Sequence, residues 1–186
     1  MAGSEALSKL FLRASKDSNI NHCIIPGRVD AANCDVSVYN IQSLFTNSFE
    51  SAGGPTPRFG TGDFVISRDD DRLLVFVEFS VPVKIRSIRL TSLGGTLGGS
   101  SGGSKPTRLT LYKNHGSLLD FDDVEEFDGP QFSLSEAGWK EAVPTITIHT
   151  GRHFVKLQRV ANLNILLTGE TGFRTRLDKI SFLGDA

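Results

Sequence analysis

The chain has few of the residues from which disulfides, metal sites and redox centres are built. Its 186 residues include two cysteines, Cys23 and Cys34, and these form no Cys-x-x-Cys pair. A chain of this size without a disulfide framework is typical of a reducing compartment, so we expect an intracellular protein. His22 adjoins Cys23, but nothing supplies a fourth ligand at a familiar spacing. Buried free thiols, and no metal, are therefore expected.

Long apolar runs and an excess of one charge are also missing. No stretch approaches the ~20 apolar residues that a membrane span needs, and the first residues lack the apolar centre of a secretory signal. The chain carries 20 basic and 21 acidic residues, a net charge of −1. It has no global field for a nucleic-acid backbone or an anionic membrane, so we expect neither partner.

The common catalytic motifs are absent as well. The sequence contains no Gly-x-Ser-x-Gly elbow, no His-Glu-x-x-His and no nucleotide fingerprint, which predicts neither an enzyme nor a cofactor. A triad assembled in space would leave no such signal. His149 and His153 have the spacing of helical zinc ligands, but a Thr-Gly pair between them predicts a hairpin with the two histidines on opposed strands.

Short apolar stretches, several of them alternating with polar residues, occupy most of the chain after residue 63. The alternation at 109–111 and 146–148 is that of strands with one buried and one wet face. The predicted strands are 64–66, 73–79, 83–90, 108–113, 145–149, 154–160, 163–167 and 177–183.

The run from 73 to 90 predicts two long strands joined at 80–82, after the charged residues 69–72. Its apolar residues change parity between Ile85 and Ile88, so a bulge or a bend is expected near Arg86. Pro82 precedes the second strand, where its missing N–H does no harm.

Many short strands with long connections predict an all-β fold, a jelly-roll β-sandwich. Residues 4–15 predict a short amphipathic helix, so we divide the chain into an N-terminal helical segment, 1–20, and a jelly-roll domain, 21–186. Glu5 and Asp17 argue against a transit peptide in that segment.

An acidic stretch is the first candidate for a partner site. It interleaves carboxylates with Phe121, Val124 and Phe127, and it lacks the ligand spacing of a calcium-binding EF-hand. Two interpretations remain open: a solvated acidic loop pinned to the core by its apolar residues, or a contact surface for a basic partner. The candidate residues are Asp120, Asp122, Asp123, Glu125 and Glu126.

Arg174 and Arg176 are the second candidate, because they follow the glycines at 169 and 172 at the end of a predicted strand. Their guanidinium groups suit a carboxylate or a phosphate of a partner. Ordinary surface arginines are the alternative interpretation.

Several of these segments together resemble the PITH domain family. The resemblance covers about 64–184, and its markers are 69–79, Pro82 to Lys84, 108–113, the Leu-Asp-Phe-Asp-Asp stretch at 119–123, and 175–184. Members of that family have a jelly-roll sandwich similar to galactose-binding modules. They are found at the C-terminus of thioredoxin-like proteins and as free-standing proteins.

The resemblance implies a non-enzymatic docking domain of the cytoplasm and nucleus that associates with the 26S proteasome. No Cys-x-x-Cys accompanies it here, so redox activity is not expected. A carbohydrate-binding module of related architecture is the alternative function. Such sites stack an aromatic ring on a sugar, and Trp139 and Tyr112 are the only Trp and Tyr residues in the matched region. A small-molecule ligand is therefore not expected.

Overall fold

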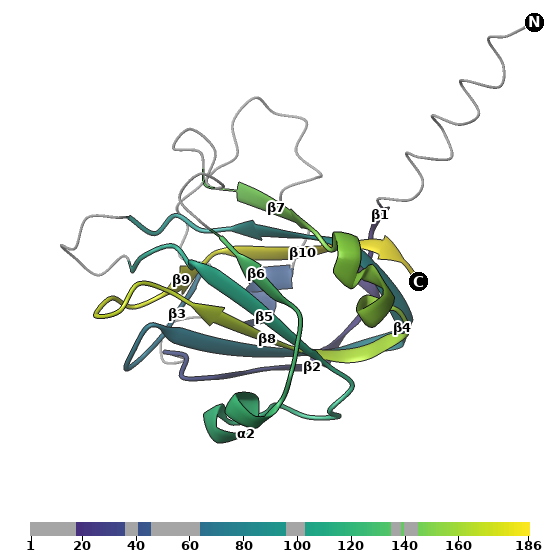
Figure 1. The fold of residues 1–186 in the computed structure, drawn as a ribbon, viewed down its shortest axis with the longest axis horizontal. Helices are drawn as coiled ribbons and strands as arrows, with labels where there is room; N and C mark the ends of the chain where they lie inside the picture. The colour runs from purple at the N-terminus through teal and green to yellow at the C-terminus, as the bar shows by residue number, and fades with distance from the viewer. Residues whose placement is uncertain (1–17, 36–40, 46–63, 96–102, 135–138, 140–144) are drawn as a thin grey trace, which may run out of the picture.

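The computed structural model describes residues 18–35, 41–45, 64–95, 103–134, 139 and 145–186, and it forms a two-layer β-sandwich (Figure 1). The fold class predicted from the sequence is confirmed. The helix expected at 4–15 lies outside the described residues. In the described part, no helix has the length and apolar character to cross a membrane.

One strand, β4 (Arg72–Thr91), belongs to both layers. Its first half pairs with β2 (Ile24–Ala32) and β8 (Val160–Thr168). Its second half pairs with β7 (Thr145–His149) and β10 (Lys179–Asp185). The prediction of two strands joined at 80–82 is therefore wrong. The backbone stays extended through Pro82 because the pairing with β8 is interrupted between Glu78 and Val83, where no N–H is needed.

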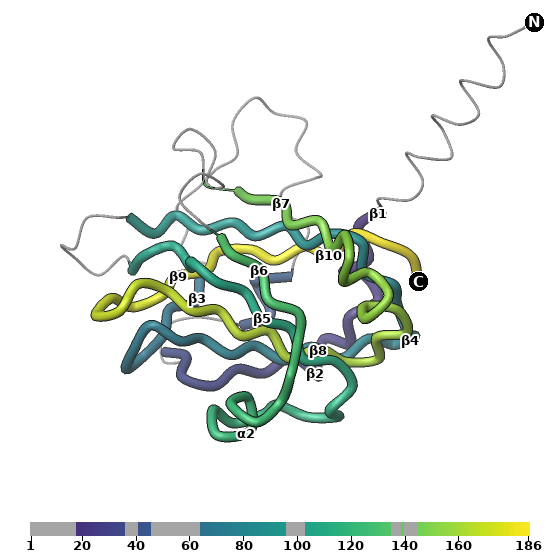
Figure 2. The backbone as a smooth tube through the Cα atoms, viewed as in Figure 1, coloured from purple at the N-terminus to yellow at the C-terminus, as the bar shows by residue number. Residues whose placement is uncertain are grey.

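The remaining strands complete the two layers with antiparallel pairs. One layer has the order β2–β4–β8–β5–β6, with β5 at Arg108–Lys113 and β6 at Gln131–Ser133. The other has the order β1–β10–β4–β7, with β1 at Ser18–Asn19. Because β1 pairs with β10, the described chain begins beside its C-terminal end (Figure 2). A separate pair joins β3 (Val65–Ile66) to β9 (Arg176–Leu177).

The core lies between the layers, and a bulge in β4 keeps its side chains directed inward. Leu183 and Gly184, which are consecutive in β10, pair with Ser87 and Ile85, so Arg86 is the extra residue. The buried positions accordingly change from odd numbers up to Ile85 to even numbers from Ile88. The bulge predicted near Arg86 is confirmed. Gly184 is required there, because a Cβ would collide with the Lys84 carbonyl oxygen.

In the described residues, four short helical segments connect the strands. They are η2 (Asn21–Cys23), η3 (Ile41–Phe45), α2 (Phe121–Glu126) and η4 (Gly151–Leu157). The predicted hairpin between His149 and His153 is wrong, since the chain enters η4 after β7 and the next strand begins only at Val160. Thr150 causes this departure by donating from its backbone N and its Oγ1 to the Arg86 carbonyl oxygen, at 2.9 and 2.8 Å.

Candidate functional site

The acidic stretch forms helix α2, and two of its carboxylates organise the start of the helix. Asp120 is the N-cap, and its Oδ1 accepts a 2.8 Å hydrogen bond from the backbone N of Asp123. The Asp123 carboxylate in turn accepts from the backbone N of Asp120 at 3.5 Å. This reciprocal capping satisfies donors that a helix start leaves free. Asp120 and Asp123 therefore shape the helix.

Apolar side chains hold α2 on the outer face of one layer. Val124 and Leu119 are buried against Leu74 of β4 and Tyr112 of β5. The Tyr112 hydroxyl donates to the carbonyl oxygen of Val124 at 3.2 Å. Burial raises the pKa of Tyr112, and the nearby carboxylate of Asp128 raises it further. The prediction that apolar residues pin the acidic stretch to the protein is confirmed for Val124.

A buried amide fixes the chain that leads into α2. Asn164 of β8 is fully buried, and its Oδ1 accepts from the backbone N of Leu119 at 3.0 Å. Its Nδ2 donates to the carbonyl oxygen of Ser117, also at 3.0 Å. Both polar atoms of the amide are thus satisfied, as a buried amide requires. The position of α2 is set by the sheet beneath it.

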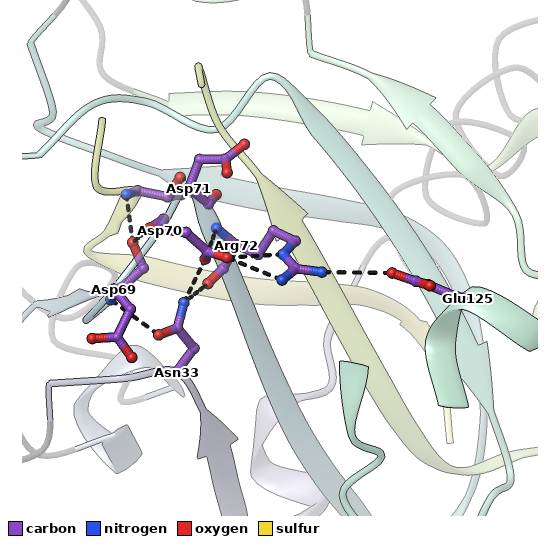
Figure 3. A network of polar contacts seen from close by, with 8 residues as sticks. Asn33, Asp69, Asp70, Asp71, Arg72 and Glu125 are labelled. Carbon is purple, nitrogen blue, oxygen red and sulfur yellow. Dashed lines mark hydrogen bonds and ion pairs between the residues drawn. The ribbon is translucent and has the colours of Figure 1, made fainter. Parts of the chain in front are cut away.

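Arg72 connects α2 to the Asp-rich turn before β4 (Figure 3). Its guanidinium pairs with Asp70 at 3.0 Å, lies 4.5 Å from the ring centre of Phe121, and reaches Glu125 at 3.9 Å. Asn33 holds the turn, because its Nδ2 donates to Asp70 Oδ1 and to the Arg72 carbonyl oxygen, each at 2.6 Å. The turn is an ordered polar network.

The outer side of α2 combines carboxylates with one exposed aromatic ring. Asp122 and Glu126 are exposed, and neither makes an ion pair with another described residue. Phe127, which the sequence suggested was a pinning residue, is 40% exposed because the helix ends there and its backbone is extended. Its ring lies 4.5 Å from that of His115. We define the α2 surface as Asp122, Glu125, Glu126, Phe127 and Asp128.

The two predicted arginines lie in the segment that carries β9, and both have partners inside the protein. Arg176 is bound to Asp178 at 2.8 Å, its side chain is 14% exposed, and its guanidinium lies 3.7 Å from the ring centre of Phe64. Arg174 pairs with Asp35 at 3.2 Å and donates to the Ser67 carbonyl oxygen at 2.6 Å. Neither arginine contacts α2 in the described structure, so the two sets of candidate residues do not form one site.

The residues considered as metal ligands do not come together. In the described part of the chain, no three His, Cys, Asp or Glu side chains are grouped to hold a metal ion. Cys23 and Cys34 are free and buried, as predicted. Burial raises the pKa of the Cys34 thiol to about 11, and the negative charge of Asp35 acts in the same direction. Both effects keep this thiol in its neutral, unreactive form.

The aromatic residues considered for sugar stacking are engaged in packing. Trp139 is buried, and its Nε1 donates to the carbonyl oxygen of Pro106 at 3.1 Å. Tyr112 is buried beneath α2. Neither ring is available to stack on a ligand at the surface.

Similar solved structures show where this fold occurs. Two tandem modules named CBM32-1 and CBM32-2, from Clostridium perfringens ZmpB in complex with GalNAc, match at TM-score 0.57 and 10% identity, over 100% of this chain and 40% of that chain. A Streptococcus pneumoniae fucose-binding module matches at TM-score 0.51 and 8% identity, over 89% and 96%. The C-terminal domain of a Bacteroides fragilis chitobiase matches at TM-score 0.52 and 10% identity, over 90% and 97%. At these identities the likeness shows the fold alone.

Sequence similarity gives the family. Thioredoxin-like protein 1 of Schizosaccharomyces pombe is 29% identical over 124 residues, which are 66% of this chain and 40% of that protein. The chain thus matches less than half the length of this curated relative. The family model described as the PITH domain matches residues 13–186. Because that match covers almost the whole chain, the protein belongs to the PITH domain family.

Proposed function

We propose that this chain is a protein-interaction module that docks to the 26S proteasome through its α2 surface. Membership of the PITH domain family supports the protein-interaction module. The proteasome is the partner that the family resemblance implies, and the cytoplasm and nucleus are the compartments proposed with it. The observation that carries the site is an acidic helix, fixed from below, with an exposed Phe127 at its end.

The composition of the α2 surface suits a basic protein patch. Aromatic side chains supply much of the binding energy at protein interfaces when they enter a pocket of the partner. Charged residues around such an anchor mainly set the association rate and the orientation. Phe127 provides the anchor, and Asp122, Glu126 and Asp128 provide exposed negative charges beside it. Because α2 is capped and packed, little ordering is needed on binding.

The proposal assigns no catalytic role. PITH domains, and the sandwich that this chain shares with carbohydrate-binding modules, are non-catalytic domains. The proposed mechanism is therefore recognition only, with the sandwich as a rigid support for the α2 surface.

Biolayer interferometry with the immobilised chain and purified 26S proteasome tests this function. The variant Asp122→Asn/Glu126→Gln removes two exposed negative charges and leaves the capping pair intact. We expect it to weaken binding by about three- to tenfold, mainly through a slower association that depends on salt. Phe127→Ser should weaken binding by about tenfold or more.

The control is Glu170→Lys, which changes the net charge by the same amount at an exposed residue between β8 and β9. Binding like that of the wild type is expected. Absence of any binding by the wild type would overturn the proteasome as partner. Binding that none of the α2 variants weakens would remove this surface from the proposal. Reversing the charge of all five acidic candidates from the sequence analysis would be a poorer test, because two of them, Asp120 and Asp123, cap the helix.

A carbohydrate-binding function is the alternative, and the fold shared with a fucose-binding module supports it. The burial of Trp139 and Tyr112 argues against it. A glycan array decides between the two: a saturable hit would favour the alternative, and signals at background would remove it.

A further inference from the structure

A second surface, on the segment between β7 and β8, is built differently from the α2 surface. η4 is anchored by Leu157, which is buried in the core between the layers. Its Phe154 ring lies 4.7 Å beneath the Arg86 guanidinium, which is itself paired with Asp185 at 2.7 Å. At its start, Thr150 is bonded to the Arg86 carbonyl oxygen. These contacts fix η4 where the two layers meet at β4 (Figure 1).

The outward side chains of this segment are basic and apolar. Val155 is 76% exposed, more than any other large hydrophobic side chain in the described part. Arg152, Lys156 and Arg159, which are close to it in the sequence, are exposed as well. Residues 151–159 contain no carboxylate, and the carboxylate of Asp185 is already occupied by Arg86. We define the η4 surface as Arg152, Val155, Lys156 and Arg159.

From this arrangement we infer that the η4 surface docks an acidic protein segment that carries an aliphatic or aromatic side chain. Carboxylates of the segment pair with the three cations, and its apolar side chain covers Val155. This inference goes beyond the proposed function, because the α2 surface is acidic and fits a basic partner. The protein would then have two docking surfaces of opposite charge.

The composition of the surface favours a protein segment over a nucleic acid or a membrane. Single-stranded nucleic acids stack their bases on exposed aromatic rings. Here the Phe154 ring is covered by Arg86, and the exposed apolar residue is aliphatic. Peripheral membrane binding needs an apolar face along a helix, and η4 exposes one large apolar residue. A single exposed valine beside cations is complementary to an acidic segment whose apolar side chain covers the valine.

Fluorescence anisotropy measures this binding with a defined probe, a short labelled peptide rich in Glu with leucines spaced along it. We expect saturable binding that weakens when ionic strength rises from about 0.01 M to about 0.15 M, because the screening length shortens. A peptide with Ser in place of Leu should bind about tenfold more weakly. A peptide with Lys in place of Glu should not bind.

Variants of the chain then locate the site. Val155→Ser should weaken peptide binding by about tenfold, and Lys156→Glu by about fivefold. The matched control is Arg108→Glu, an equal charge change at the exposed start of β5, which pairs with the opposite end of β8 from η4. It should bind the peptide as the wild type does. Binding that Arg108→Glu weakens as much as Lys156→Glu would overturn the inference.

Three further outcomes would also overturn the inference. The first is no saturable peptide binding by the wild type, and the second is tighter binding of a labelled oligonucleotide or of anionic vesicles that Lys156→Glu abolishes. The third is self-association in sedimentation that is lost in both Lys156→Glu and Asp122→Asn/Glu126→Gln. The third would make the α2 surface of a second copy the occupant. Proteasome binding is a separate measurement, so failure of the proposed function and failure of this inference are distinguishable.

Discussion

The α2 and η4 surfaces are both short helical segments held on the sandwich by residues of its strands, and they have opposite charge. The buried Asn164 and Tyr112 hold α2 and the chain that leads into it, and the partly exposed Arg86 holds η4. The outward side chains are then free to differ. α2 presents carboxylates and a phenylalanine, whereas η4 presents three cations and a valine.

This difference explains why the overall composition says little about partners. A net charge of −1 excludes a global field, but it arises from local groups of opposite sign. At physiological salt the screening length is about 8 Å, so each surface acts on its own neighbourhood. The partner of each surface is therefore predicted from the charge of that surface, and not from the net charge of the chain.

Asn164→Ala should cause the greatest loss of stability, and it should loosen α2 without loosening η4. The substitution leaves the buried backbone N of Leu119 without its partner, and it removes the part-buried hydrogen bond to the Ser117 carbonyl oxygen. Leaving the buried donor unsatisfied costs about 1–3 kcal/mol and losing the second bond about 1 kcal/mol, so the free energy of unfolding should fall by about 2–4 kcal/mol. Urea denaturation measures the loss. Hydrogen exchange should accelerate at residues 114–130 and stay unchanged at residues 151–159.

Asn162→Ala is the matched control on the same strand, because its Oδ1 accepts a hydrogen bond from Gly116 in an exposed position. Its cost should be about 0.5 kcal/mol. Equal losses for the two variants, or faster exchange at η4 in Asn164→Ala, would contradict the separate anchoring of the two surfaces.

Raising the pH should loosen α2 before η4. The pKa of Tyr112 is raised in the folded protein, by burial first and by Asp128 second. Its stabilising contribution is therefore complete below the unfolded pKa of about 10 and is lost as the pH rises through the folded value. Hydrogen exchange across this range should show residues 114–130 opening first.

Tyr112→Phe sharpens the same test. It removes the hydrogen bond to Val124, at a cost of about 1 kcal/mol at neutral pH. In this variant the alkaline loosening of α2 should disappear. Loosening that persists in Tyr112→Phe would assign the effect to another group.

The smallest expected effect comes from Thr150→Val, which alters η4 alone. The variant loses the hydroxyl donor to the Arg86 carbonyl oxygen, but that oxygen still accepts from the backbone N of residue 150. The free energy of unfolding should fall by about 0.5–1 kcal/mol. Faster exchange should be confined to residues 151–159. Faster exchange at α2 as well would show that the two surfaces are coupled.

The sequence predicts the sandwich, the family and the bulge, because these depend on alternation and on local motifs. β5 and β7 have the predicted bounds, and the parity change in β4 locates Arg86 as the extra residue. β2 was missed, because Pro26 and Gly27 within it are typical of a loop. In the structure the pairing of β2 with β4 shifts between Ile24 and Val29, and that irregularity accommodates these residues.

The candidate site was only partly predictable. Charge density identified the acidic stretch, but its division into capping residues and outward residues depends on helix α2, which was not predicted. The Asp-x-x-Asp spacing of Asp120 and Asp123 was the available signal for that helix. The exposure of Phe127 and the pairing of Arg176 with Asp178 depend on tertiary contacts, which no local pattern reports.

One interferometry series compares the binding of purified 26S proteasome to the wild type, to Asp122→Asn/Glu126→Gln and to Lys156→Glu. It decides whether the α2 surface is the docking site for the proteasome. We expect the α2 variant to weaken binding by about three- to tenfold, and the η4 variant to bind as the wild type does. Weakening by Lys156→Glu with no change in the α2 variant would contradict the assignment of the two surfaces.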